Sequence, residues 1–450
     1  MRRAQVALMA GTIYLCSACT RVPQADDCQV SSLVRERITK HVHWNQGSLE
    51  DNQVKCCLEH LLQQELTVDT AIQIALLNNP QIQANFEELG IAQADLVKAG
   101  LFQNPIFEGF ARFPNRSSLV TNVEFSVTQG FLSVFLIPLR KKVAATELEQ
   151  AEYKVANVVL DLAFDVRETY YSLQAEQTKL GLLELLVDVT CSSNLLAVKQ
   201  RGAGNINDLE LQSHTSLYLQ AKLELSKTQN QIAHLHKELN TLLGLRPSQA
   251  NWHIPNELPG LPEEEISQET LHALALSQRL DVAYLRLEIT RISEVGATKE
   301  WWAYADLDVG VSGERDVDGT RVFGPTFSTA VPFFDHGQAD RARLFSILKQ
   351  SKHRLQALEI DVLADVTRSF NQLLINRNRV SIYRNEFIPL QKTIIATSQN
   401  FYNVMGLSVY KLLQNKQEEL HAKIEHAMAL RDYWVTRVEL DRAVGGALHK

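Results

Sequence analysis

The sequence repeats itself at a separation of 200 residues, and this repetition constrains the fold more than any other feature. The matching pairs are Ala75 with Ala275, Leu76 with Leu276, Ile82 with Val282, Asp161 with Asp361, Asp165 with Asp365, Val166 with Val366 and Leu173 with Leu373. Near the end of each half the separation becomes 202, so that Gly204 aligns with Gly406. The register predicts a tandem duplication with copies at 66–247 and 266–445 and a linker at 248–265.

The distribution of proline predicts long helices in each copy. No proline occurs between Leu139 and Arg246, and only Pro389 lies between Phe333 and Lys450. Interior proline costs a helix about 3 kcal/mol, so both stretches suit helices. Their apolar residues recur every three or four positions, a spacing typical of coiled coils, as at Val155, Val159, Leu162, Val166, Tyr170 and Leu173, and at Val362, Val366, Phe370 and Leu373. Gly202, Gly204 and Gly406 divide each stretch into two helices joined by a tight turn.

Each copy also carries a hairpin of two strands, near 105–129 and near 304–332. Val123, Phe125 and Val127 alternate with polar residues in the first, and Leu307, Val309 and Val311 do so in the second. Strands of about ten residues with one apolar and one polar face suit a membrane barrel. Four strands do not close a barrel, and open edges are not tolerated in lipid, so several chains must combine their strands.

The N-terminus reads as an export signal, residues 1–18, followed by Cys19. Arg2 and Arg3 precede a short apolar stretch, and Ser17-Ala18 provide small residues before the cysteine, as in bacterial lipoproteins. We expect a covalent lipid on Cys19 and an anchoring extension over 19–65; a plain secretory signal is the alternative. Past the N-terminus, we expect no segment with the roughly 20 apolar residues of a membrane-spanning helix.

Composition and motifs argue against several other classes of protein. The net charge of −7 and the lack of a long basic run exclude a nucleic-acid partner. No nucleophile elbow, phosphate loop or H-E-x-x-H pair occurs, so we expect no catalytic residues. His41, His43 and His60 lie near two cysteines in a spacing that fits no standard zinc pattern, and we expect neither a metal nor any cofactor beyond the lipid. The remaining cysteines leave the disulfide connectivity open, namely Cys28, Cys56, Cys57 and Cys191.

Several motifs in chain order resemble the TolC-like outer-membrane efflux proteins. "LTVDTAIQIALLNNPQIQANFEELGIAQADLVKAGLFQNP", residues 66–105, is similar to the opening helices of that family. "VPFFDHGQADRARL", residues 331–344, resembles its exit from the last strand, and "RGAGNINDLELQ" and "NVMGLSVYKLLQ" resemble its two hairpin tips. The likeness covers about residues 65 to 445, and "GLFQNP" is most similar to the branch associated with cation and heavy-metal efflux.

The resemblance implies a mainly helical protein with membrane strands. It implies a homotrimer with a 12-stranded outer-membrane barrel and a periplasmic tunnel of coiled-coil helices. Its implied partners are a periplasmic adaptor protein, an inner-membrane pump of the resistance-nodulation-division type and outer-membrane lipid. The chain itself would be a passive conduit, not an enzyme. A lipid-anchored periplasmic coiled-coil scaffold or adaptor is the alternative.

Candidate functional positions follow from this layout. We predict that the two tips contact the adaptor through Gly202, Gly204, Asn207, Asp208, Gly406, Ser408 and Tyr410. Asp208 either narrows the pore, as acidic residues near the tip do in the family, or serves only as a charge in the first turn of its helix. Its counterpart in the second copy is Tyr410, which argues against two acidic rings. Glu124, Asp306 and Asp308 are predicted to face the lumen, either as a cation-favouring lining or as a merely solvated wall.

Overall fold

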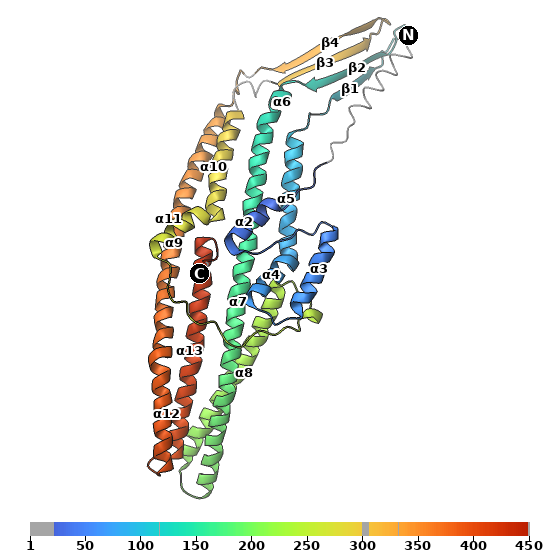
Figure 1. Ribbon diagram of the computed structural model, residues 1–450. Helices are drawn as coiled ribbons and strands as arrows, with labels where there is room; N and C mark the ends of the chain where they lie inside the picture. The colour runs from blue at the N-terminus through green and yellow to red at the C-terminus, as the bar shows by residue number, and fades with distance from the viewer. Residues whose placement is uncertain (1–21, 117, 299–305, 332, 449–450) are drawn as a thin grey trace. The chain divides into compact units, whose positions relative to one another are not determined.

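The computed structural model describes residues 22–116, 118–298, 306–331 and 333–448 (Figure 1). The elements of the first half are α2 (Cys28–Ile38), α3 (Leu49–Leu62), α4 (Val68–Asn78), α5 (Pro80–Ala99), β1 (Ile106–Arg112), β2 (Asn122–Gly130), α6 (Leu132–Phe135), α7 (Ile137–Gly202) and α8 (Asp208–Leu242). A 3-10 turn, Pro247–Gln249, leads into the second half. There follow α9 (Gln268–Gln278), α10 (Leu280–Thr298), β3 (Asp306–Arg315), β4 (Arg321–Ala330), α11 (Gln338–Ile382), a π-helical turn (Tyr383–Phe387), α12 (Ile388–Asn403) and α13 (Val409–Val444).

The chain forms two compact units, and each unit draws on both halves of the sequence. One comprises residues 1–27, 86–152 and 285–353, and it contains the strands. The other comprises residues 28–85, 153–284 and 354–450, and it is helical. The four predicted strands and the predicted pairs of long helices are confirmed.

The strands form one antiparallel sheet in the order β1-β2-β3-β4. The two hairpins join through β2 and β3, where Val127 lies opposite Val311 and Phe125 lies opposite Gly313. Gly310 permits this close pairing, because a Cβ there would come within 2.1 Å of the carbonyl oxygen of Val127. Residues that are opposite in an antiparallel pair lie on the same face, so the register places the two apolar patterns on one side of the sheet.

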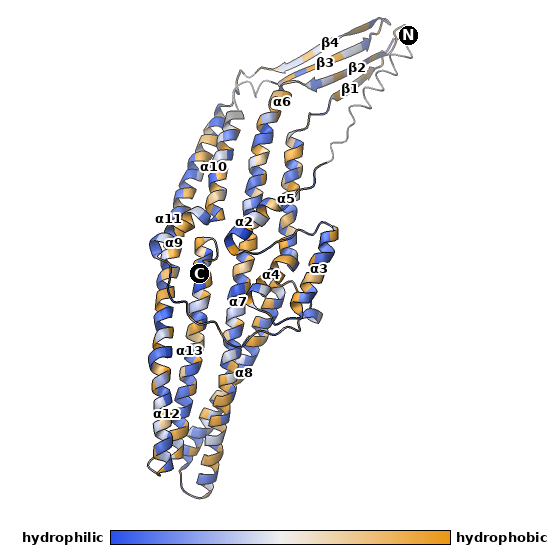
Figure 2. Ribbon diagram, viewed as in Figure 1, coloured by the Kyte–Doolittle hydropathy of each residue, from blue (hydrophilic) through white to orange (hydrophobic). Residues whose placement is uncertain are grey.

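The helical unit has a core made from the predicted apolar stripes. Val155, Val159, Val166, Tyr170 and Leu173 of α7 are all buried. In the second half, Val362, Val366 and Leu373 of α11 pack with Leu430 and Tyr433 of α13. Figure 2 shows that hydrophobic and hydrophilic residues are interspersed along α8 and α13, as expected of helices with one packed side.

Pro389 is accommodated by a local change in the helix. Its ring lacks an N–H and would clash with the carbonyl four residues earlier in a regular α-helix. The π-helical turn at Tyr383–Phe387 lies directly before it, and α12 then carries Pro389 in its first turn. The helix continues through this turn without a break, so the π-helical turn is where the missing N–H is accommodated.

The segment before the first copy is folded. Val30, Val34 and Ile38 of α2 are buried, and so are Leu58 of α3 and Trp44 in the connection between them. Residues 28–62 therefore contribute to the core of the helical unit, in addition to any anchoring role.

One expectation about hydropathy was wrong. Among the described residues, α7 contains an 18-residue window that is long and apolar enough to cross a membrane, with a mean hydropathy of 1.5. Only 28% of this window is buried, and a single helix of this kind is weak evidence of a membrane span.

Candidate functional site

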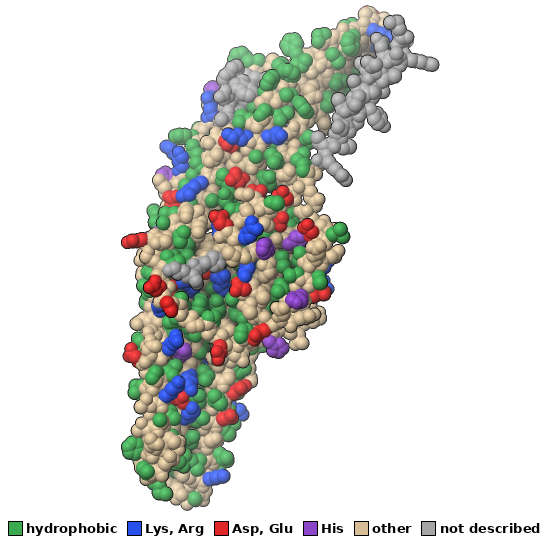
Figure 3. All heavy atoms as spheres, in the orientation of Figure 1, with side chains coloured by type: hydrophobic (Ala, Val, Ile, Leu, Met, Phe, Trp, Pro, Cys, Tyr) green, Lys and Arg blue, Asp and Glu red, His purple; other side chains and the backbone are tan. Residues whose placement is uncertain are grey.

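One face of the sheet is apolar and open. Phe125 and Phe327 are 52% and 79% exposed, although large apolar side chains are seldom exposed in contiguous groups. The register places them on the same face as Phe107, Val127, Val309, Val311 and Phe323. Hydrophobic side chains cover much of the visible surface of the strands in Figure 3. Such a face is suited to contact with lipid or with another protein.

The opposite face is mostly polar and carries the predicted lumen residues Glu124 and Asp308. Glu124 lies directly opposite Glu314, and Asp308 lies opposite Ser328. Like charges placed opposite each other repel, and neighbours relieve them here: the Asn122 amide donates to Glu314 at 2.5 Å, and Arg112 lies 3.7 Å from Glu124. Asp306 begins β3 opposite Ala330, and its side chain lies outside the described part of the structure.

The sheet has two outer strands. Within the described residues, β1 pairs only with β2, and β4 pairs only with β3. Their free backbone groups can bind further strands, and exposed edges of this kind must be paired or covered in a stable protein.

The first helical tip lies between α7 and α8. Gly204 has φ +76°, a left-handed conformation that glycine adopts readily. The Asn207 side chain accepts a hydrogen bond from the Glu210 N–H at 2.9 Å and caps α8. Asp208 accepts two hydrogen bonds from Arg201, at 2.5 and 3.1 Å, and these lower its pKa. The ion pair with Arg201 thus gives Asp208 a structural role. That Asp208 also narrows the pore stays a prediction.

The second tip is built differently from the first. Ser408 caps α13 by accepting from the Lys411 N–H at 3.2 Å. The left-handed residue, however, is Met405, with φ +57°, and not Gly406. Gly406 closes the turn by donating its N–H to Phe401 at 2.8 Å. A non-glycine residue in the left-handed region costs about 1–2 kcal/mol, and sequence gives no warning of it.

Tyr410 joins the two helical hairpins. Its hydroxyl donates to Gln200 Oε1 at 3.3 Å, and its ring stacks on His214 with the ring centroids 4.5 Å apart. Tyr410 is therefore half-buried between hairpins, and less available to a partner than the other predicted tip residues. No local pattern indicates this contact, because the partners are about 200 residues apart in the sequence.

Apolar side chains stand exposed beside both tips. Leu209 is 76% exposed, Val404 is 74% exposed and Met405 is 96% exposed. On the face shown in Figure 3, the ends of the hairpins carry few charged side chains. Exposed apolar groups on rigid turns are suited to binding a protein partner.

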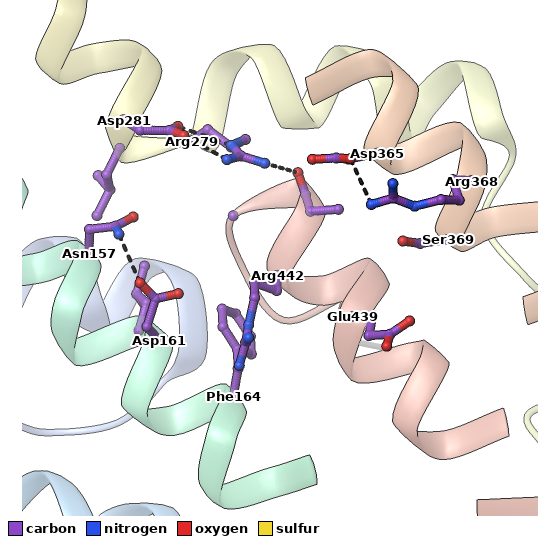
Figure 4. A pocket seen from close by; sticks show the side chains of 14 residues that line it. Asn157, Asp161, Phe164, Arg279, Asp281, Asp365, Arg368, Ser369, Glu439 and Arg442 are labelled. Carbon is purple, nitrogen blue, oxygen red and sulfur yellow. Dashed lines mark hydrogen bonds and ion pairs between the residues drawn. The ribbon is translucent and has the colours of Figure 1, made fainter. Parts of the chain in front are cut away.

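A charged pocket of about 450 Å³ lies in the helical unit, where α7, α11 and α13 approach the beginning of α10 (Figure 4). Arg279 donates to both carboxylate oxygens of Asp281, at 3.0 and 2.6 Å, and to the carbonyl of Ala443 at 3.3 Å. Arg368 pairs with Asp365 at 2.8 Å. Burial raises the pKa of Asp161, which faces this pocket. The pocket therefore lies at a junction of helices that is lined by ion pairs.

The structure also places the four free cysteines and His43. Cys28, Cys56, Cys57 and Cys191 are free and exposed. His43 lies 2.7 Å from Asp51, whose carboxylate also accepts from the backbone of Gly47 and Ser48. Within the described ranges, no group of three or more His, Cys, Asp or Glu side chains is placed to hold a metal ion. Cys19, the predicted lipidation site, lies outside the described residues.

Comparison with known proteins extends this picture. No family model matches the sequence, and no curated protein matches it. Solved structures match most of the chain. The first is CusC, whose structure is described in connection with transmembrane channel formation. It has a TM-score of 0.68 and 17% sequence identity, and the match covers 85% of this chain and 92% of the CusC chain. The Campylobacter jejuni CmeC outer membrane channel has a TM-score of 0.68 and 15% identity and covers 84% of this chain and 86% of its own. The Vibrio cholerae outer membrane protein VceC has a TM-score of 0.69 and 14% identity and covers 85% of this chain and 97% of its own.

These neighbours define the class of the fold. The chain has the fold of outer-membrane channel proteins, and the resemblance to TolC-like efflux proteins is confirmed at the level of the fold. The predicted mainly helical chain with a few strands is confirmed, and its one small sheet matches the fold of these neighbours.

Proposed function

We propose that this chain is one protomer of an outer-membrane efflux channel, a passive conduit that contains no catalytic residue. It would be located in the bacterial outer membrane with a helical extension into the periplasm. The observation that carries the proposal is the two-faced sheet: exposed Phe125, Phe323 and Phe327 on one face, and Glu124 and Glu314 on the other. A sheet between lipid and an aqueous lumen needs this division.

The proposed assembly is a homotrimer. The free edges of β1 and β4 support it, because three copies of a four-stranded sheet would close a 12-stranded barrel and remove every edge from lipid. Closure by symmetry also leaves no strand open to uncontrolled aggregation.

A tandem duplication is supported by the order of the elements. Two shorter helices, two strands and then long helices follow one another in each half, α7 and α8 in the first and α11, α12 and α13 in the second. The last helix of each half also ends at a left-handed glycine, Gly244 with φ +68° and Gly445 with φ +86°. Each glycine packs on the residues that join the two short helices of its own half, at Asn79 and Arg279.

The proposed partners are a periplasmic adaptor and an inner-membrane pump of the resistance-nodulation-division type. The exposed apolar residues beside the tips, Leu209, Val404 and Met405, support an adaptor contact. Gly204, Asn207, Asp208 and Ser408 would shape this contact by fixing the turns. Cys19 is proposed to carry the lipid, which mass spectrometry of the mature N-terminal peptide would detect.

The test is imaging and conductance of the mature protein extracted from outer membranes. We expect three-fold particles that contain a barrel and that conduct ions across a planar bilayer. A monomeric rod without conductance would overturn the proposal and favour a lipid-anchored periplasmic scaffold or adaptor. The charge reversals Glu124→Lys and Glu314→Lys sharpen the test, because both residues are on the polar face. Each should lower the preference for cations, while a lysine at the exposed tip residue Leu209 should not.

A further inference from the structure

Two consecutive cysteines, Cys56 and Cys57, are exposed on α3. Both thiols are free, and neither side chain is part of the core. Cysteine is among the residue types most often buried, and packing does not explain two adjacent exposed ones. Their thiol chemistry is therefore the property to examine.

The helix holds the pair in a fixed position. Asp51 accepts from the backbone of Gly47 at 2.7 Å and of Ser48 at 3.0 Å, which fixes the beginning of α3. Leu58 is buried at 9% exposure, and α3 packs against α4. Figure 1 shows α3 beside α4 in the helical unit. The side of α3 that carries the two cysteines stays open to solvent.

The pair does not close on itself as a disulfide. A disulfide needs Cα atoms about 4.4–6.8 Å apart, whereas consecutive Cα atoms are about 3.8 Å apart. Closing the bond would distort the helix. Both thiols therefore remain free and exposed at consecutive positions of α3.

We propose that Cys56 and Cys57 bind one soft, thiophilic metal ion of the Cu(I) and Ag(I) class. Such ions prefer thiolate ligands and accept two of them, so a pair suffices. On binding, each thiol loses its proton, two metal–sulfur bonds form and two protons are released to solvent. His60 lies one turn further on, but no three-residue group in the described chain is placed to hold a metal, so the site uses the two thiolates. This inference does not rest on the channel function.

The chain contains its own matched controls. Cys28 on α2 and Cys191 on α7 are also free and exposed, yet each has no cysteine next to it in sequence. The variant C28S/C191S keeps the pair, and C56S/C57S keeps only the separate cysteines. Cys19 is unchanged in both double variants, so any metal that it binds contributes equally to the two measurements.

The experiment adds Ag(I) to the reduced mature protein in chloride-free buffer with glutathione as a competing single thiol. C28S/C191S should retain one silver ion per chain, and C56S/C57S should retain none. The single variants Cys56→Ser and Cys57→Ser should each bind about 100-fold more weakly, since joining two binding groups gains at least that factor. His60→Ala should bind like the parent, and a loss as large as in the cysteine variants would overturn the two-thiolate site.

Alkylation gives an independent measurement at each thiol. One equivalent of Ag(I) should protect Cys56 and Cys57 together from iodoacetamide, while Cys28 and Cys191 in the same molecule react as before. Equal protection of all four cysteines would contradict the proposal, as would half an ion per chain, which would mean that silver bridges two copies. Circular dichroism spectra of the variants should match the parent, which separates loss of binding from loss of folding.

Discussion

Gly244 at the end of α8 and Gly445 at the end of α13 occupy corresponding places in the two halves, but their surroundings differ. In the first half the contacts are neutral: the Asn79 amide donates to the carbonyl of Leu242 at 2.8 Å. In the second half Arg279 takes the corresponding place, donates to Ala443 at 3.3 Å and pairs with Asp281. The backbone geometry is shared while amide hydrogen bonds are exchanged for ion pairs. Shape is therefore the feature required at these junctions, and charge is the variable one.

The largest expected loss of stability comes from replacing the two glycines, because both halves require their left-handed backbone geometry. Gly244→Ala places a Cβ 2.7 Å from the carbonyl oxygen of Asn78 in a left-handed residue and should destabilise the fold by about 3 kcal/mol. Gly445→Ala meets its nearest atom at 3.0 Å and should cost about 2 kcal/mol. Thermal unfolding in detergent measures both. The control Gly181→Ala in α7 has free space and should be neutral or stabilising by up to about 1 kcal/mol; equal losses at all three would contradict this explanation.

The exchanged contacts should differ in their response to salt. Asn79→Ala and Arg279→Ala should each cost about 1 kcal/mol, because each removes hydrogen bonds that hold a helix end. The loss at Arg279 should shrink in part in 1 M salt, because salt partly screens its half-buried ion pair with Asp281, and the loss at Asn79 should not change. Urea unfolding at low and high salt measures the difference. The same salt dependence for both variants would show that the ion pair with Asp281 contributes nothing.

Another difference between the halves concerns pH. Burial, with the neighbouring Glu149 and Asp26 carboxylates, raises the pKa of Glu152 to about 7, whereas the corresponding residue of the second half is Lys352. Between about 4.5 and 7 the folded chain holds a proton that the unfolded chain releases. Stability should therefore fall as pH rises through this range and level off above it. Glu152→Gln should be more stable than the parent at pH 8 and equal to it near pH 4, as followed by thermal unfolding; a constant difference at both values would contradict the shifted pKa.

The smallest effect is expected at the tips, where the first has an ion pair and the second has an aromatic contact. Arg201 lowers the pKa of Asp208, so the pair stabilises the fold above about pH 4 and its contribution is lost as pH falls below that value. Because both groups are solvent-exposed, Asp208→Asn should leave the melting temperature at pH 7 almost unchanged. Tyr410→Ala should lower it measurably, since it removes the stacking on His214. A larger fall in melting temperature for Asp208→Asn than for Tyr410→Ala would show that the exposed ion pair contributes more to stability than the aromatic contact.

Regular local patterns allowed much of the fold to be predicted. The proline-poor stretches became α7, α8, α11, α12 and α13, and the alternating segments became β1 to β4. Pro389 was recognised as the one interruption of the second stretch, but the π-helical turn that accommodates it was not. Such a turn depends on where the freed carbonyls find partners, and no local pattern encodes that.

The candidate sites were predicted less completely. Asn207 and Ser408 cap their helices, which short polar side chains before an apolar run indicate. The left-handed conformation of Met405 could not be predicted, because glycine at the next position was the better candidate. The partners of Asp208 and Tyr410 could not be predicted either, since they depend on how helices meet.

The sequence alone determined the repeated order of helices and strands, the two faces of the sheet and the positions of the turns. These depend on periodicity, proline and glycine, whose effects extend over a few residues. Only the tertiary structure decided that the two hairpins join through β2 and β3 into one sheet, that Tyr410 meets His214 and that Arg279 replaces Asn79 at a helix junction. Such contacts join residues far apart in the chain. Their energies depend on packing and distance, which are set only once the helices and strands have come together.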